Sequence, residues 1–179
     1  MMDPWIQHKT IWPTEAKFMS WVRGGIRAGL WKKHPVKLEF LRQNTILTVN
    51  TNPRSMKRFP MVKAARCALC RAVHSIKDIE VDHLTGNHSL RSMDDLRAFI
   101  EAMIMVTFDD LQLVCKPCHK IKSYAEKQGI TFADARAEKH AILLIKGKKD
   151  VTWLEERGMI PASNQVGRRK QIIDALKEV

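Results

Sequence analysis

The chain has 179 residues, of which 45% are hydrophobic, and its formal net charge at pH 7 is +12. This length and apolar content allow a buried core, which excludes wholesale disorder, and no apolar run is long enough to span a bilayer. Residues 1–66 contain 13 Lys or Arg and 3 Asp or Glu, and this excess predicts a polyanionic partner unless it serves only solubility.

The N-terminal segment predicts two helices and then an irregular basic stretch. Thr14 is a candidate cap for a helix to about Lys32, because apolar residues follow it at helical spacing. Pro35 opens a second short helix to about Gln43. Residues 44–60 are rich in turn formers and predict a linker or an exposed loop that faces the polyanion.

The rest of the chain alternates short strands with helices. Residues 61–81 predict short strands, and residues 111–114 predict another. Ser92 and Asp95 have the spacing of a capping box at the start of a helix. The predicted helices cover residues 92–106, 115–128, 131–144, 152–157 and 166–177. Arg168, Arg169 and Lys170 open the last of them, which is either a small DNA-reading unit or a structural appendage.

These elements predict an α+β chain that is mainly helical and has three parts. Residues 1–60 form a basic helical arm and linker, residues 61–128 a core, and residues 129–179 a C-terminal helical extension. The first five residues lack the pattern of a signal peptide, so we expect a cytoplasmic protein with no membrane partner.

Four cysteines predict a metal site. Cys67 and Cys70 form one Cys-x2-Cys pair, and Cys115 and Cys118 form a second. In an intracellular protein such pairs bind metal more often than they form disulfides, and two pairs can close a tetrahedral zinc site. Four unligated buried cysteines are the alternative. His74 and His119 are spare ligands if one thiolate is not used.

The dipeptide Asp82-His83 lies between these two pairs, at the end of a predicted strand. Neighbouring strand residues point to opposite faces, so one side chain can bind a metal while the other faces a water molecule. A carboxylate suits Mg²⁺ or Mn²⁺, and a neutral imidazole is a suitable general base near pH 7.

The run CALC…EVDHL…DDLQLVCKPCHKIKS resembles HNH endonucleases of bacteriophage type, the ββα-metal nucleases that have a pair of zinc knuckles. The matched stretch, Cys67 to Ser123, is about a third of the chain. The upstream segment RGGIRAGLWKKHPVKLEFLRQ is similar to the basic helical segment that precedes the core in many members. The resemblance implies a zinc-stapled ββα-metal core with flanking helical arms.

The resemblance also implies roles for individual residues. His83 is then the general base that activates water, and Asp82 and His119 bind one catalytic divalent ion, Mg²⁺, Mn²⁺ or another. Lys122 lies at a position where the family often has a basic residue near the phosphate of the DNA. The middle residue of the family motif is usually Asn and is Asp110 here, which we count among the catalytic group. The residues that we expect to contact DNA are Lys122, Arg23, Arg27, Lys32, Lys33, Arg54, Lys57 and Arg58.

We therefore expect a metal-dependent DNA endonuclease with structural zinc and products that carry a 5′ phosphate and a 3′ hydroxyl. Its expected origin is a phage, with a homing-type or packaging-associated role in the host cytoplasm and a phage terminase or another phage protein as a candidate partner. His88, in the loop after the base, is a further candidate for contact with the metal or phosphate. The alternatives are a non-catalytic zinc-knuckle protein that binds nucleic acid, and a zinc-stapled protein-interaction domain.

Overall fold

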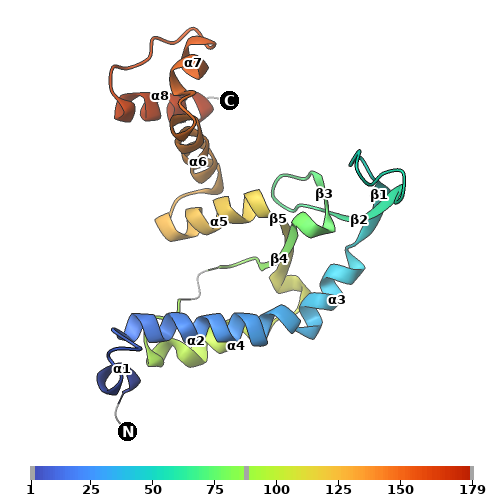
Figure 1. Cartoon of the computed structure of the whole chain (residues 1–179), viewed down its shortest axis with the longest axis vertical. Coiled ribbons are helices and arrows are strands. Elements are labelled where there is room, and N and C mark those ends of the chain that lie inside the picture. The colour runs from blue at the N-terminus through green and yellow to red at the C-terminus, as the bar shows by residue number, and fades with distance from the viewer. Residues whose placement is uncertain (1–2, 87–88, 178–179) are drawn as a thin grey trace. The chain divides into compact units, whose positions relative to one another are not determined.

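Helices and two small antiparallel sheets make up the chain, which confirms the predicted α+β class (Figure 1). The computed structural model describes residues 3–86 and 89–177, so His88 lies outside the described residues. The chain divides into two units, 1–116 and 117–179, which we describe separately. The three-part division into 1–60, 61–128 and 129–179 stays a prediction.

Unit 1 begins with helices that follow the sequence pattern closely. The Thr14 hydroxyl accepts a hydrogen bond from the backbone N–H of Lys17 at 3.3 Å, and this cap starts the long helix α2 as predicted. A short helix before it was not predicted, because only Pro4 at its first position marks it. The elements are α1 Pro4–Gln7, α2 Glu15–Gly29, the 3-10 turn η1 Trp31–Lys33, and α3 Pro35–Gln43.

A three-stranded antiparallel sheet follows, in the order β1-β2-β3, with β1 Ile46–Val49, β2 Met61–Arg66 and β3 Val73–Ser75. The prediction that residues 44–60 are irregular was therefore wrong for Ile46–Val49. This segment is too short for an alternating pattern to stand out, and it becomes a strand because it pairs with β2, from Ile46 opposite Ala64 to Val49 opposite Met61.

The second sheet has two strands, which lie far apart in the sequence. Strand β4, Ile79–His83, follows the 3-10 turn η2 Ile76–Asp78 and pairs antiparallel with β5, Leu111–Cys115. Helix α5, Lys116–Gln128, begins at the residue after β5. The segment between β4 and β5 contains η3 Met93–Asp95, α4 Leu96–Ile104 and η4 Phe108–Asp110. Its start confirms the predicted capping box, since Asp95 accepts from the backbone N–H of Ser92 at 3.0 Å.

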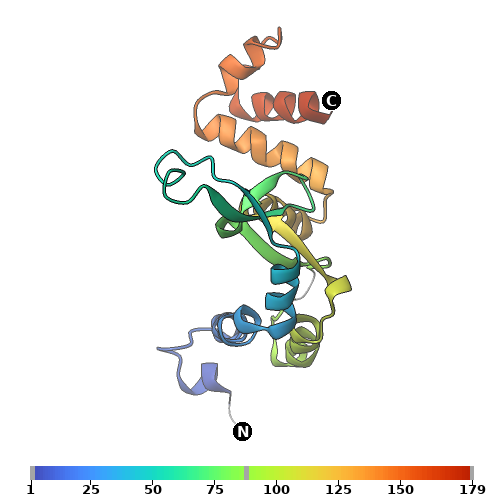
Figure 2. The same ribbon diagram turned by 90° about the vertical axis from the view of Figure 1, so that its right-hand side faces the viewer.

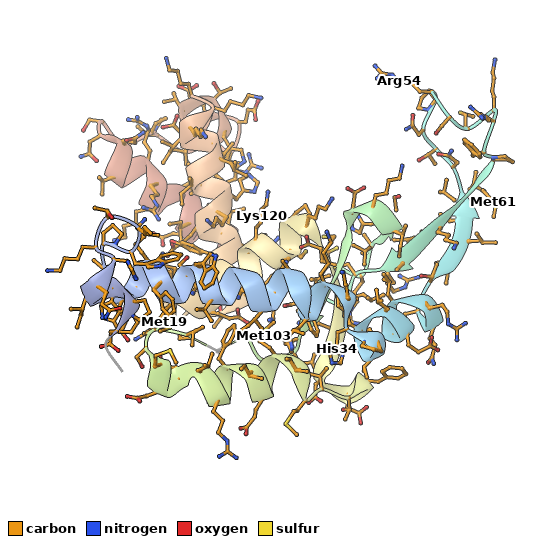
Figure 3. All side chains as sticks on the ribbon, turned by 60° about the horizontal axis from the view of Figure 1, so that its bottom comes forward. Met19, His34, Arg54, Met61, Met103 and Lys120 are labelled. Atoms are coloured by element: carbon orange, nitrogen blue, oxygen red, sulfur yellow. The ribbon has the colours of Figure 1, made fainter. Side chains whose placement is uncertain are left out.

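The core of unit 1 joins its N-terminal helices to the segment between β4 and β5. Met19 of α2 is buried against Leu90, Phe99 and Met103, the last two of which belong to α4. Figure 2 shows α2 and α4 end-on and side by side, and Figure 3 shows Met19 and Met103 between these two helices. Other partly buried side chains of the N-terminal segment pack on this cluster, namely Trp5, Phe18, Val22, Ile26 and Trp31. The N-terminal segment is therefore an integral part of unit 1.

Unit 2 contains the helical part of the chain after residue 116. Gly129 has a φ of 66° and ends α5, as its position predicted. The following helices are α6 Phe132–Lys146, α7 Asp150–Glu155 and α8 Gln165–Lys177. They share a core of Ala141, Trp153, Leu154 and Ile172.

Buried charge also fixes these helices. Asp150 is 5% exposed, and its carboxylate accepts a hydrogen bond from Arg168 Nε at 2.7 Å. Arg169 pairs with Glu138 at 3.3 Å. Arg168 and Arg169 are thus engaged within unit 2, which favours the structural appendage over a DNA-reading unit for this helix pair. Among the described helices, none combines the length and apolar content that crossing a membrane requires.

Candidate metal centre and acid–histidine site

The four cysteines come together, as their spacing predicted. Cys67 follows β2, Cys115 ends β5, and Cys118 lies in the first turn of α5. The four Sγ atoms all lie within 4.8 Å of one another, and those of Cys70 and Cys115 are 3.9 Å apart. Four sulfurs placed tetrahedrally around zinc at about 2.3 Å are about 3.8 Å apart, so the donor set and its spacing fit structural zinc.

The first knuckle is a tight turn closed by backbone hydrogen bonds. The N–H of Arg71 donates to the carbonyl of Cys67 at 2.9 Å, and the N–H of Cys67 donates to the carbonyl of Ala72 at 2.9 Å. Arg71 has a φ of 63°, a left-handed conformation that costs a residue with a side chain roughly 1–2 kcal/mol. The N–H of Ala68 donates to the carbonyl of Leu113 at 2.7 Å and so attaches the knuckle to β5.

The surroundings of Cys67 favour its thiolate. Burial raises the pKa of this thiol, but hydrogen bonds outweigh burial and hold it at about 7, below its ordinary value. The backbone donors are the N–H groups of Cys70, Cys115 and Leu69. The Cys115 N–H lies 3.3 Å from Cys67 Sγ. Because a thiolate is the form that binds metal, this environment supports a metal site. His74 lies beside the cluster, with Nε2 3.5 Å from Cys70 Sγ.

Strand β4 presents Asp82 and His83 on opposite faces, as the strand period predicted. Ile79, Val81 and His83 are buried, whereas Glu80 and Asp82 are half-buried. In the register with β5, Asp82 lies opposite Gln112, and His83 lies opposite Leu111. The acid and the imidazole therefore face different surroundings although they are neighbours in the chain.

His83 is held by a residue that the sequence did not single out. The Trp31 ring stacks on the His83 imidazole, with centroids 4.3 Å apart and planes inclined by 27°. Lys37 Nζ lies 5.0 Å from the centroid of the same Trp31 ring. His83 is only 8% exposed. A tryptophan 52 positions before the histidine, in no recognisable motif, gives no sequence signal for this contact.

Asp110 shapes the end of the loop after His83. Its Oδ2 accepts from the backbone N–H of Thr107 at 2.7 Å and from the Thr107 hydroxyl at 2.9 Å, and its own carbonyl accepts from the Leu84 N–H at 2.8 Å. The Thr107 hydrogen bonds lower the pKa of the Asp110 carboxyl, and His83 adds to this shift. The Asp110 carbonyl therefore fixes the main chain of Leu84, the residue after His83, and this contact does not depend on the side chain at position 110.

For the nuclease expected from the sequence, Asp110→Asn should cleave DNA at the wild-type rate or faster. The Asn carbonyl oxygen can still accept from the Thr107 N–H, and the contact with Leu84 is between main-chain atoms. The measurement is the rate of plasmid cleavage, with the melting temperature as the check on folding. A large drop in rate in a folded protein would show that Asp110 has a direct role, for example as a metal ligand.

Cations from the N-terminal helices lie near the acidic face of β4. Partial burial and the neighbouring Arg23 lower the pKa of Arg27, while the Asp82 carboxylate opposes this shift. Partial burial also lowers the pKa of Lys37, and Glu80 opposes it. Arg27, predicted as a DNA contact, and Lys37, which was not, thus act electrostatically on β4.

The other predicted residues are distributed between the two units. His119 is half-buried on α5, directly after Cys118, and Lys122 Nζ forms an ion pair with Glu126 at 2.6 Å on the same helix. Arg23 is half-buried. The remaining predicted DNA contacts are exposed, with Lys32 and Lys33 on η1, and Arg54, Lys57 and Arg58 between β1 and β2.

Comparisons with protein-family models, with curated proteins and with solved structures find no match to this chain. What the protein does must therefore be inferred from the chemistry of its own side chains.

Proposed function

We propose that this protein is a metal-dependent DNA endonuclease of the ββα-metal type. One observation supports the proposal most directly. Strand β4 ends in Asp82-His83 and pairs with β5, which runs straight into the second cysteine pair and α5. A purely structural zinc module needs the cysteines but has no need of an acid–histidine pair on the adjacent strand.

In this proposal His83 removes a proton from a water molecule as the water oxygen bonds to phosphorus. The bond between phosphorus and the 3′ oxygen breaks, which leaves a 5′ phosphate and a 3′ hydroxyl. Asp82 and His119 would hold the divalent ion: the hard carboxylate oxygen suits Mg²⁺ or Mn²⁺, and the imidazole nitrogen suits transition-metal ions. A divalent ion bound there supplies charge that stabilises the leaving 3′ oxygen.

The surroundings of His83 agree with a positioned base. Stacking on Trp31 fixes the plane of the imidazole, and the edge that carries the nitrogens is not the surface used for stacking. The Gln112 side-chain amide donates to the His83 carbonyl at 3.3 Å, and the Leu84 N–H is held by Asp110. A base that is fixed from several sides loses little entropy in the transition state.

A non-catalytic zinc protein that binds nucleic acid is the second candidate. The observation that favours it is the burial of His83, whose 8% exposure limits the approach of water. The cysteine cluster and the basic surface fit this function equally well.

Incubation of the purified protein with supercoiled plasmid distinguishes the two candidates. The nuclease converts plasmid to nicked or linear forms with Mg²⁺ or Mn²⁺, and excess EDTA stops the reaction. Binding without cleavage under every metal condition, in a zinc-loaded and folded preparation, would assign the protein to the second candidate.

A further inference from the structure

One stretch of unit 1 is basic and lacks acidic residues. Residues 40–77 contain no Asp or Glu, and they contain eight Lys or Arg: Arg42, Arg54, Lys57, Arg58, Lys63, Arg66, Arg71 and Lys77. Five of these lie in the hairpin formed by β1, β2 and their connection, residues 46–66, which we call the β1–β2 ribbon. No carboxylate in the described part of the chain forms an ion pair with Arg54, Lys57 or Arg58. In the described part of the chain these three cations of the ribbon are therefore not neutralised by an ion pair, and the nearby acid Asp78 is paired with Lys116 at 3.7 Å.

The connection between the strands is a folded loop, which agrees with the second of the two alternatives predicted for this stretch, a linker or an exposed loop. Asn50 is 5% exposed, and its side-chain amide donates to the Phe59 carbonyl at 2.7 Å and to the Ser55 hydroxyl at 3.0 Å. Its Oδ1 accepts from the Asn52 N–H at 3.0 Å. Figure 3 shows Arg54 at the outer end of this loop. Because the loop is internally hydrogen-bonded, the backbone that carries its cations is ordered before any partner binds.

Apolar side chains are exposed beside these cations. Leu47 and Val49 are each 67% exposed, and they lie opposite Lys63 and Met61 in the register of β1 with β2, on the same face of the sheet. Phe59 and Met56 of the loop are 53% and 46% exposed, and the Arg58 guanidinium lies 5.2 Å from the Phe59 ring centroid. Large apolar side chains exposed next to cations on a rigid hairpin indicate a binding surface.

A groove beside the β1–β2 ribbon adds neutral hydrogen-bonding groups. It is lined by strand residues such as Val49 and Lys63 and by loop residues that carry amide or hydroxyl groups, namely Asn50, Thr51, Asn52 and Ser55. Side chains of Lys, Arg, Ser, Thr and Asn make most protein contacts to the DNA backbone. A two-stranded β-ribbon fits the major groove of B-DNA, and apolar side chains beside basic ones contact sugars and base edges.

We propose that the β1–β2 ribbon is a docking surface for double-helical DNA, built from residues other than those of the Asp82-His83 site. The proposal takes its partner, DNA, from the proposed function, but it does not require that the protein cleaves DNA. A second copy of this chain is a poorer occupant, because a self-complementary interface places this patch, with Lys57, Arg58 and Lys63, against the same basic patch of the other copy.

The test measures binding of a fluorescently labelled DNA duplex over a range of salt concentrations, without Mg²⁺ or Mn²⁺. The triple variant Arg54→Ala/Lys57→Ala/Arg58→Ala should bind at least about tenfold more weakly near 0.1 M salt. Each lost phosphate contact should lower the slope of log affinity against log salt by about 0.9. Phe59→Ala should weaken binding and leave the slope unchanged, since the lost contact is uncharged.

The matched control is Lys127→Ala/Arg136→Ala/Lys146→Ala, which removes the same charge from exposed positions of unit 2. It should bind like the wild type. Equal losses in both triple variants would show that only net charge matters and would overturn the proposal. If the triple variant does not fold, the single variant Lys57→Gln, at an exposed position, replaces it in the test and should lower the salt slope by about one. An unchanged slope in a folded Lys57→Gln protein would also overturn the proposal.

Two further outcomes separate this proposal from others. A wild type that is dimeric without DNA, with a monomeric Leu47→Glu variant that binds DNA normally, would assign the face to a second copy of the chain. DNA binding that depends on the ribbon, with no plasmid cleavage, would overturn the proposed nuclease function and leave the docking surface intact. Plasmid cleavage that the ribbon variants do not affect would overturn the docking surface and leave the nuclease function intact.

Discussion

Replacing His83 by Ala is expected to reduce DNA cleavage by about a hundredfold or more, because general bases contribute on this order to rate. Zinc content and duplex affinity should remain close to those of the wild type, since His83 belongs neither to the cysteine cluster nor to the β1–β2 ribbon. The measurements are single-turnover cleavage of plasmid, metal analysis and binding of a DNA duplex.

The stacking on Trp31 requires a second variant. His83→Ala leaves a gap beside Trp31, so a lost rate in this variant alone does not separate the missing base from disturbed packing. His83→Phe keeps an aromatic ring against Trp31 but has no basic nitrogen, and it should be as inactive as His83→Ala. His8→Ala, at an exposed position, is the control for histidine removal and should cleave normally. Wild-type rates in His83→Phe would falsify the assignment of the base.

Replacing any one of the four cysteines by Ser is expected to abolish zinc binding and the cooperative unfolding transition of the protein. Structural zinc contributes about 10–16 kcal/mol to small zinc-dependent folds, which is comparable to the whole stability of a typical domain, about 5–15 kcal/mol. The measurements are zinc content and thermal melting followed by circular dichroism.

The cluster offers an internal control for packing. Cys67 is fully buried, so Cys67→Ser also places a hydroxyl in the core, whereas Cys70 is exposed and its replacement removes almost no packing. Similar large losses of stability in Cys67→Ser and Cys70→Ser therefore point to the metal. A Cys70→Ser protein that melts like the wild type, with no zinc in either, contradicts the structural zinc site.

Local sequence signals predicted most helices of this chain. The caps at Thr14, Ser92 and Thr131 are present, and the Thr131 hydroxyl accepts from the Asp134 N–H at 3.1 Å. Such signals act within one turn, which is why they can be read from the sequence. Strand β1 and the fold of the loop around Asn50 depend on partners in β2 or across the loop, and composition alone does not report them.

The features of the candidate site also divide into those that the sequence predicted and those that depend on long-range packing. The spacing of the cysteines predicted their cluster, because two residues between ligands fit one metal ion. The opposite faces of Asp82 and His83 followed from the strand period. The stacking of Trp31 on His83 is a long-range contact that depends on how α2 and η1 pack in unit 1, and no periodic pattern specifies it.

The core shared by α2 and α4 also determines when this protein can fold during its synthesis. Met19 leaves the ribosome 80 residues before Phe99, its partner in the core, and at about 5–20 residues per second this interval is about 4–16 s. During that time the apolar side chains of the first helices that later join this core, among them Phe18 and Ile26, have no partner in α4 to pack against. The core is incomplete until Met103 has been made, and the second cysteine pair emerges later still, so the cysteine cluster is incomplete until Cys118. The first helices are therefore exposed to chaperones and to aggregation until the segment that contains α4 has been made.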